Sequence, residues 1–224
     1  MSETFEYIRS DLHRHTQERS ARVLLKHLLL NRSFKYMFWF RLCRAPNPIV
    51  RGVARVMHWR LSRRYGIQIP ACTRIGYGFY IGHYMSIVVN HTTVIGDNCN
   101  ISQFTTIGSN SDRAARIGDN VYIGPGVSIV EDVCIGDNAT IGAGTVVTRD
   151  VPANATAVGS PAVCRPSRSP GEFVNNRWPV IGTRSAAPAA PVAPLGAGTR
   201  TSAATSTASA ASDAKEGNRL GAPA

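Results

Sequence analysis

Residues 117–147 read IGDNVYIGPGVSIVEDVCIGDNATIGAGTVV, with an aliphatic residue at every sixth position. These positions are Ile117, Ile123, Ile129, Ile135, Ile141 and Val147, and glycine directly follows four of them. A period of six fits neither an α-helix nor a single β-strand, whose side-chain periods are about 3.6 and 2. It is typical of a solenoid that is built from short repeated units.

Each six-residue unit predicts one short strand followed by a turn, with the aliphatic side chain pointing to the axis of a coil. The Gly, Asp-Asn and Ala-Gly pairs that follow supply the tight backbone conformations of a corner. Three sides close a triangular coil of about 18 residues, and coils stack at roughly 4.8 Å. Each coil buries apolar side chains only against its neighbours, so the stack is the stable unit. We therefore expect a mainly β fold, a left-handed parallel β-helix of about four to five coils.

Two earlier series extend the repeat towards the N-terminus. They are Ile69, Ile75, Ile81 and Ile87, and then Val89, Ile95, Ile101 and Ile107. The step from Ile107 to Ile117 is ten residues instead of six. About four residues within 109–114 are therefore expected to leave the coil as a loop, which is a candidate lip for a functional site.

The repeat divides the chain into three predicted segments: a helical segment 1–65, a β-helix domain 66–164 and a low-complexity tail 165–224. In the first, Phe34, Met37, Phe38 and Leu42 recur at helical spacing. The prolines at 46 and 48 predict that one helix ends near Arg44 and that another runs from Pro48 to Tyr65. The tail is rich in Ala, Ser, Thr, Pro and Gly, so we expect it to be mostly disordered.

The formal charge of +11 is concentrated in the N-terminal third. The sequence contains no nucleic-acid-binding module, so the alternatives are a solvated basic helix surface, contact with an anionic membrane surface, or binding of a phosphorylated small molecule. No apolar stretch is long enough to span a bilayer, and acidic residues precede the first apolar run, unlike in a signal peptide. The five cysteines form no close pair, which indicates a reducing compartment. We expect a cytoplasmic protein.

Only two of the six histidines, His83 and His91, lie in the repeat. His83 stands two residues after the inward Ile81 and should project from a coil, either as a solvated side chain or as a catalytic group. His91 lies in an Asn-His-Thr-Thr turn, where it is either a catalytic group or simply a corner residue of the coil. With no third histidine and no cysteine pair at ligand spacing, we expect no metal site.

The stretch Gly66 to Ala162 resembles the serine acetyltransferase family of hexapeptide-repeat acyltransferases. The resemblance rests on GIQIPACTRIGYGFYIGHYMSIVVN, on the later IGDN repeats and on the ending VPANATAVGSPA. It looks closer still to the branch that acetylates exopolysaccharide sugars, of the colanic-acid type. It implies an O-acetyltransferase that takes acetyl from acetyl-CoA and assembles as a homotrimer, with sites between subunits.

The resemblance also implies roles for single residues. His83 would take the proton from the acceptor hydroxyl, and an imidazole is the usual protein group for this step. Gly108, Pro125 and Ala143 would line the pantetheine channel. Arg149 or Arg165 would meet the cofactor phosphates, with a plain surface cation as the alternative for each. Arg113 matches the loop Arg that meets the serine carboxylate in that family, with a solvated loop Arg as the alternative. Asp112 and Asn90 are the other residues expected to meet the acceptor.

The chain departs from the serine-specific members of this family at two positions. Gln68 replaces an Asp that orients the base, and Ala114 replaces a second His. Gln68 can hold the imidazole ring by a hydrogen bond, but it cannot stabilise imidazolium by charge. These departures favour a saccharide acceptor, with serine as the alternative. A non-catalytic trimeric scaffold is the alternative of another class.

The segment FKYMFWFRLCR at residues 34–44 is aromatic and basic. It could meet an anionic lipid-linked saccharide or a membrane surface, or simply pack against the coils.

Overall fold

The computed structural model describes residues 3–18 and 20–179. Four helices come first, at the bounds α1 Glu3–His15, α2 Ala21–Leu30, α3 Arg32–Leu42 and α4 Pro48–Tyr65. Asn47 caps α4 by accepting hydrogen bonds from the backbone N–H groups of Ile49 and Val50. Gly66 ends α4 in the left-handed conformation, with φ +67°. The predicted break between the last two helices is therefore confirmed.

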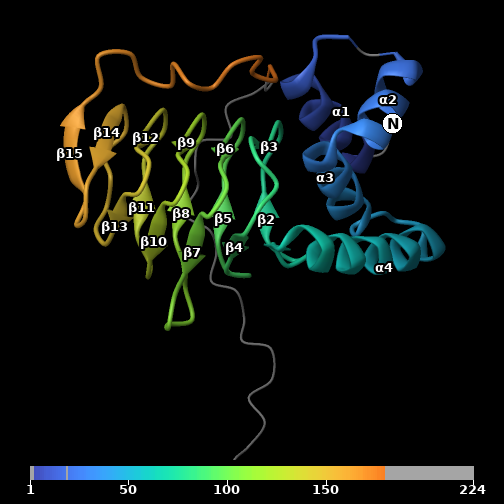
Figure 1. Ribbon diagram of the computed structural model, residues 1–224, viewed down its shortest axis with the longest axis horizontal. Helices are drawn as coiled ribbons and strands as arrows, with labels where there is room; N and C mark the ends of the chain where they lie inside the picture. Colours follow the sequence, from blue (N-terminus) through green and yellow to red (C-terminus); the bar gives the residue numbers. More distant parts are fainter. Residues whose placement is uncertain (1–2, 19, 180–224) are drawn as a thin grey trace, which may run out of the picture. The chain divides into compact units, whose positions relative to one another are not determined.

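Residues 67–158 wind into a parallel β-helix with three sheets, and the last strand, 163–166, pairs antiparallel with the strand before it (Figure 1). Sheet A contains β1 (Ile67–Gln68), β4 (Ile87–Val89), β7 (Thr106–Gly108), β10 (Ser128–Val130) and β13 (Val146–Val147). Sheet B contains β2 (Arg74–Ile75), β5 (Val94–Ile95), β8 (Arg116–Ile117) and β11 (Cys134–Ile135). Sheet C contains β3 (Tyr80–Ile81), β6 (Asn100–Ile101), β9 (Tyr122–Ile123), β12 (Thr140–Ile141), β14 (Ala155–Val158) and β15 (Val163–Pro166).

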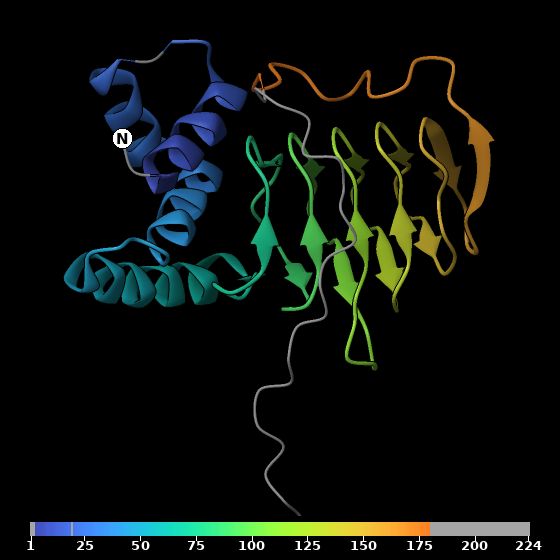
Figure 2. The same cartoon turned by 180° about the vertical axis from the view of Figure 1, so that it is seen from behind.

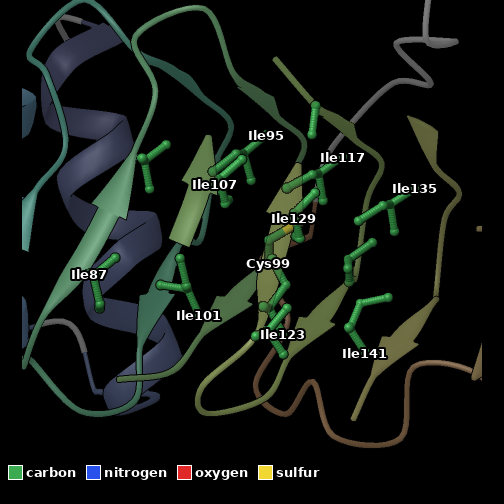
Figure 3. Packing of buried hydrophobic residues seen from close by; sticks show 14 of the residues in the cluster. Ile87, Ile95, Cys99, Ile101, Ile107, Ile117, Ile123, Ile129, Ile135 and Ile141 are labelled. Atoms are coloured by element: carbon green, nitrogen blue, oxygen red, sulfur yellow. The ribbon is translucent and has the colours of Figure 1, made fainter. Parts of the chain in front are cut away.

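The aliphatic repeat forms the core of this β-helix, as the sequence predicts. In sheet B, Ile75 pairs with Ile95, Ile95 with Ile117 and Ile117 with Ile135. Every member of the three aliphatic series is at most 4% exposed. Figure 3 shows these side chains stacked along the inside of the coils, with Cys99 among them. The mainly β solenoid fold is thereby confirmed.

The Asp-Asn pairs form stacked corners. Asn98, Asn120 and Asn138 all have φ between 56° and 58°, the left-handed region that asparagine tolerates. The neighbouring aspartates bind the coil before: Asp119 accepts a 2.7 Å hydrogen bond from the backbone N–H of Asp97, and Asp137 accepts one from Asp119. The asparagine of each pair thus turns the chain, and the aspartate joins two coils.

The helices cover the first coil. Tyr36, Met37 and Phe40 of α3 belong to the same buried cluster as Ile67 and Ile75. The aromatic segment 34–44 is therefore largely packed inside the protein, which confirms the packing alternative for this segment.

After β15 the chain runs back across the coils towards the helices, as the orange segment in Figures 1 and 2 shows. We call residues 167–179 the return segment. Gly171 donates to the carbonyl of Asn138 at 3.1 Å, and the amide of Asn98 donates to the carbonyl of Trp178 at 3.1 Å. The structure thus gives residues 165–179 a defined path, whereas the rest of the predicted disordered tail, 180–224, lies outside the described residues.

Candidate active site

His83 lies at the corner where the chain passes from β3 of sheet C to β4 of sheet A. Its side chain is exposed, and its backbone carbonyl accepts a 3.0 Å hydrogen bond from the N–H of Met85. The corners of the next coils stack on this one, because Phe104 donates to the carbonyl of Met85 and Gly126 to that of Gln103. Pro125 and then Ala143 follow along the same corner, where Gly144 donates to the carbonyl of Pro125.

A pocket of about 560 Å³ opens beside His83, and we call it the His83 pocket. Three parts of the chain that are distant in sequence form it: α1, the outer side of sheet C with its corners, and the return segment. Its lining includes Arg14, Asn100, Ser102, Gln103, Pro125 and Phe173.

Arg14 places a buried positive charge in this pocket. The residue is 5% exposed, and its guanidinium donates to the carbonyls of Gly78 at 2.6 Å and Asn175 at 2.9 Å, and to Oδ1 of Asn100 at 2.6 Å. Burial lowers the pKa of Arg14 to about 10, so the group stays protonated near neutral pH. These three acceptors are uncharged, and no carboxylate in the described part of the chain forms an ion pair with Arg14. Arg14 thus contributes to the lining of this pocket a buried guanidinium whose hydrogen-bond acceptors are uncharged.

Gln103 contributes a buried polar atom. Among the described residues, its Oε1 has no hydrogen-bond partner. A buried acceptor without a partner costs about 1–3 kcal/mol, so an N–H or O–H group of a bound molecule would be stabilised there.

A second pocket of about 520 Å³ lies on the helical side of His83. Its lining includes His15, His27, Asn31 and Tyr84. Burial lowers the pKa of His15 to about 4, with further contributions from His27 and Arg14. The exposed imidazole of His83 therefore borders two pockets, one with a buried cation and one with a half-buried neutral histidine.

Gln68, the predicted orienting residue, lies at an exposed position of β1 and pairs with Val88. Within residues 3–18 and 20–179, no hydrogen bond joins Gln68 to His83. His91 is exposed in the turn after β4 and belongs to neither pocket.

The predicted loop is present between β7 and β8 (Figure 1). Glu131 holds it in place, because its carboxylate accepts a 2.9 Å hydrogen bond from the hydroxyl of Ser109 and a 3.3 Å bond from the N–H of Asn110. These hydrogen bonds lower the pKa of the exposed Glu131. Ala114 is buried, and its N–H donates to Oγ1 of Thr92 at 3.0 Å.

The predicted acceptor residues do not join His83 within one chain. Arg113 is exposed and lies 4.0 Å from Oδ2 of Asp132. Oδ1 of Asn90 accepts from the backbone N–H and the hydroxyl of Thr92. Neither these residues nor Asp112 line the two pockets.

The predicted cofactor residues fall into two groups. Pro125 lines the His83 pocket, and Ala143 is exposed one coil further along the same corner. Gly108 lies at the end of β7, with its carbonyl accepting from Glu131, while Arg149 and Arg165 are exposed in the last coils. The structure therefore brings one of the five, Pro125, into a pocket with His83.

Arg14, Asn100 and Gln103 are pocket residues that the sequence did not single out. Arg14 lies in a helix 69 residues before His83, and no repeat links the two positions. Asn100 and Gln103 follow the six-residue pattern and look like ordinary outward positions. In the described residues, no group of three or more His, Cys, Asp or Glu side chains is arranged to hold a metal ion.

Comparison with known proteins identifies the relatives of this chain. Residues 114–149 match the family model described as bacterial transferase hexapeptide (six repeats). Serine acetyltransferase 1, chloroplastic, of Arabidopsis thaliana is 42% identical over 114 residues, which are 49% of this chain and 36% of that protein. The serine acetyltransferase of Synechococcus elongatus is 34% identical over 48% of this chain and 52% of its own. The chain thus spans about a third to a half of the length of these curated relatives.

Solved structures extend the match into the helical segment. The soybean serine acetyltransferase apoenzyme is 35% identical, with a TM-score of 0.61 over 72% of this chain and 69% of that chain. A serine acetyltransferase in complex with CoA has a TM-score of 0.61 at 26% identity, over 72% of this chain and 69% of its own. The repeat, the β-helix and the similarity to the soybean protein together show that the chain belongs to the serine acetyltransferase family of hexapeptide-repeat acyltransferases.

Proposed function

We propose that the protein is an acetyl-CoA-dependent O-acetyltransferase in which His83 is the general base. The observation that carries this proposal is the position of His83, exposed at a corner of the β-helix and bordering two pockets in a chain of this family. The acceptor hydroxyl loses its proton to His83 as its oxygen attacks the acetyl carbonyl. The C–S bond then breaks, and the proton passes to the sulfur of CoA, which leaves as a thiol.

We propose that acetyl-CoA binds along the corner of the β-helix that carries His83. Pro125 and Ala143 present small side chains there, and Gly126 and Gly144 turn the chain with φ of 69° and 67°. A thin pantetheine arm can approach the backbone along such a corner, and backbone N–H groups can stabilise the developing oxyanion. The relative solved with CoA supports acetyl-CoA as the donor. Gly108, Arg149 and Arg165 are proposed for the rest of the cofactor.

For the acceptor, we propose serine or a compound that shares its carboxylate. All the relatives described above are serine acetyltransferases, and they give no support to the exopolysaccharide branch that the sequence departures favoured. The buried Arg14 supports an anionic acceptor, because a guanidinium in a sheltered pocket binds carboxylate strongly.

We propose a homotrimer with sites at the contacts between subunits. Met85 and Phe104 lie on the corner next to His83 and are more than half exposed, at 52% and 54%. A neighbouring subunit that covered these side chains would bring its own loop, with Asp112 and Arg113, towards the acceptor. This arrangement would account for the distance of both residues from His83 within one chain. The cytoplasmic location stays a prediction, and the Arabidopsis relative is described as chloroplastic.

The test is release of CoA thiol from acetyl-CoA by the full chain, with L-serine, serinamide, nucleotide sugars and oligosaccharides as acceptors. The proposal predicts release with serine and much less with serinamide, which lacks the carboxylate. Release with saccharides alone would contradict a serine acceptor and support the predicted exopolysaccharide acceptor. If no acceptor stimulates release and acetyl-CoA gives no thermal shift, the scaffold alternative replaces the enzyme.

A further inference from the structure

Helix α4 exposes an apolar surface along its outer side. Ile49, Val53, Val56 and Trp59 are 75%, 51%, 57% and 58% exposed. Ala54, His58 and Leu61, on the opposite side of the helix, are buried against the rest of the protein. The exposed residues are spaced by three or four positions, so they share one face. We call Ile49, Val53, Val56 and Trp59 the α4 apolar face.

Arginines surround this face. Arg55, Arg60, Arg63 and Arg64 are exposed on α4, and the guanidinium of Arg63 lies 5.0 Å from the ring centre of Trp59. The positive charge extends beyond the helix, because residues 20–96 contain 12 Lys and Arg and no Asp or Glu. An exposed apolar stripe with arginines and no carboxylates has the composition of a helix that lies on an anionic membrane surface.

Charge distinguishes between two possible partners of this surface, a second copy of the chain and an anionic membrane. A second copy of the same face would bring arginines against arginines, with no carboxylate on either side to compensate them. Anionic lipid headgroups supply the missing charge, and the acyl boundary below them accepts the apolar side chains. The association would be peripheral, since no helix in the described residues is long and apolar enough to cross a bilayer.

We propose that the α4 apolar face and its arginines bind the surface of a membrane that contains anionic lipids. The helix lies parallel to the surface, with Trp59 at the level of the headgroups and the arginines on the phosphates. The binding helix is thus α4, and not the segment 34–44 that the sequence suggested, because the aromatic side chains Phe34, Tyr36 and Phe40 are buried. This inference does not depend on the proposed acetyl transfer.

The test is sedimentation of the purified full chain with vesicles of phosphatidylcholine alone and of phosphatidylcholine with about one third phosphatidylglycerol. We expect binding to the anionic vesicles only, weakened at high salt because screening reduces the attraction to phosphates. Val56→Ser with Trp59→Ser, and separately Arg60→Glu with Arg63→Glu, should each lower the partition coefficient at least about tenfold.

Matched controls lie at the far end of the β-helix and in the return segment. Val163→Ser removes an apolar side chain that is also exposed, and Arg168→Glu reverses an exposed charge. Both should leave vesicle binding unchanged. Equal binding of the α4 variants and the parent would overturn the proposal. So would a change in oligomeric state on substitution of the α4 apolar face, because a second copy would then be its occupant.

Discussion

The guanidinium of Arg14 donates a 2.6 Å hydrogen bond to Oδ1 of Asn100, and both residues line the pocket that contains His83. The amide of Asn100 in turn donates to the carbonyl of Phe173 at 2.9 Å. Helix α1, the second coil and the return segment therefore meet at a buried cation beside the proposed base.

Replacement of Arg14 by Met should raise the KM for serine by at least about tenfold, because the carboxylate loses a charge-assisted hydrogen bond. The KM for acetyl-CoA should change by less than about twofold. Since Arg14 also joins three parts of the fold, the deciding measurement is the ratio of kcat/KM for serine to that for serinamide. That ratio should fall towards one in the variant. An unchanged ratio would mean that Arg14 is structural only, and Arg168→Met, an exposed site, is the control.

Gly108→Ala should leave the fold intact and weaken the binding of acetyl-CoA. A Cβ at Gly108 would meet no atom within 4 Å in the chain itself, so the melting temperature should not fall. If the pantetheine arm passes over this backbone, the added methyl group should raise the KM for acetyl-CoA about tenfold. Gly52→Ala, which also meets nothing within 4 Å, is the matched control and should leave this KM unchanged. A normal KM for acetyl-CoA in Gly108→Ala would remove this residue from the channel.

Asp11→Asn should destabilise the protein by about 3–5 kcal/mol, because it leaves the buried Arg41 without its anion. The two side chains are 2% and 4% exposed, and Arg41 donates to both carboxylate oxygens at 2.8 and 3.0 Å. The free energy of unfolding in urea is the measurement. Asp112→Asn, in the exposed loop, should change it by less than about 0.5 kcal/mol. Similar values for both variants would contradict the importance of the buried pair.

Because of His15, the stability of the folded protein should fall as the pH is lowered. Its pKa is lowered to about 4 in the folded protein, from 6.5, mainly by burial. The unfolded chain therefore binds the proton more readily, so this contribution is complete above about pH 6.5 and is lost as the pH falls towards 4. His15→Gln should show a smaller drop in melting temperature between pH 7 and pH 4.5. An identical pH dependence in the two proteins would contradict a half-buried neutral His15.

Much of the fold could be predicted because its determinants are local and repeated. Ile117, Ile123 and Ile135 recur at a fixed spacing, and the left-handed Asn120 and Asn138 lie where the sequence has Asp-Asn. The loop at 109–114 followed from the break in that spacing. The bounds of α4 followed from Pro48 and from the change of period after Tyr65.

The rest depends on contacts between distant parts of the chain, which no period records. Arg14 reaches the pocket only because α1 packs on the first coils, and Asn175 only because the return segment doubles back. Likewise, the composition of α3 and α4 does not reveal which helix is covered. Phe40 is buried because it packs in the cluster that includes the residues of the first coil, whereas Trp59 is exposed because it lies on the side of α4 opposite the buried Ala54, His58 and Leu61.

The most direct test of the central claim is CoA-thiol release by His83→Ala with acetyl-CoA and serine at saturating concentrations. The account predicts a fall in kcat of at least about a hundredfold, because general-base catalysis typically contributes that much or more. The melting temperature and the oligomeric state should match those of the parent protein, since His83 is exposed. Retention of parental kcat by a folded His83→Ala protein would contradict the account and make His91 the candidate base.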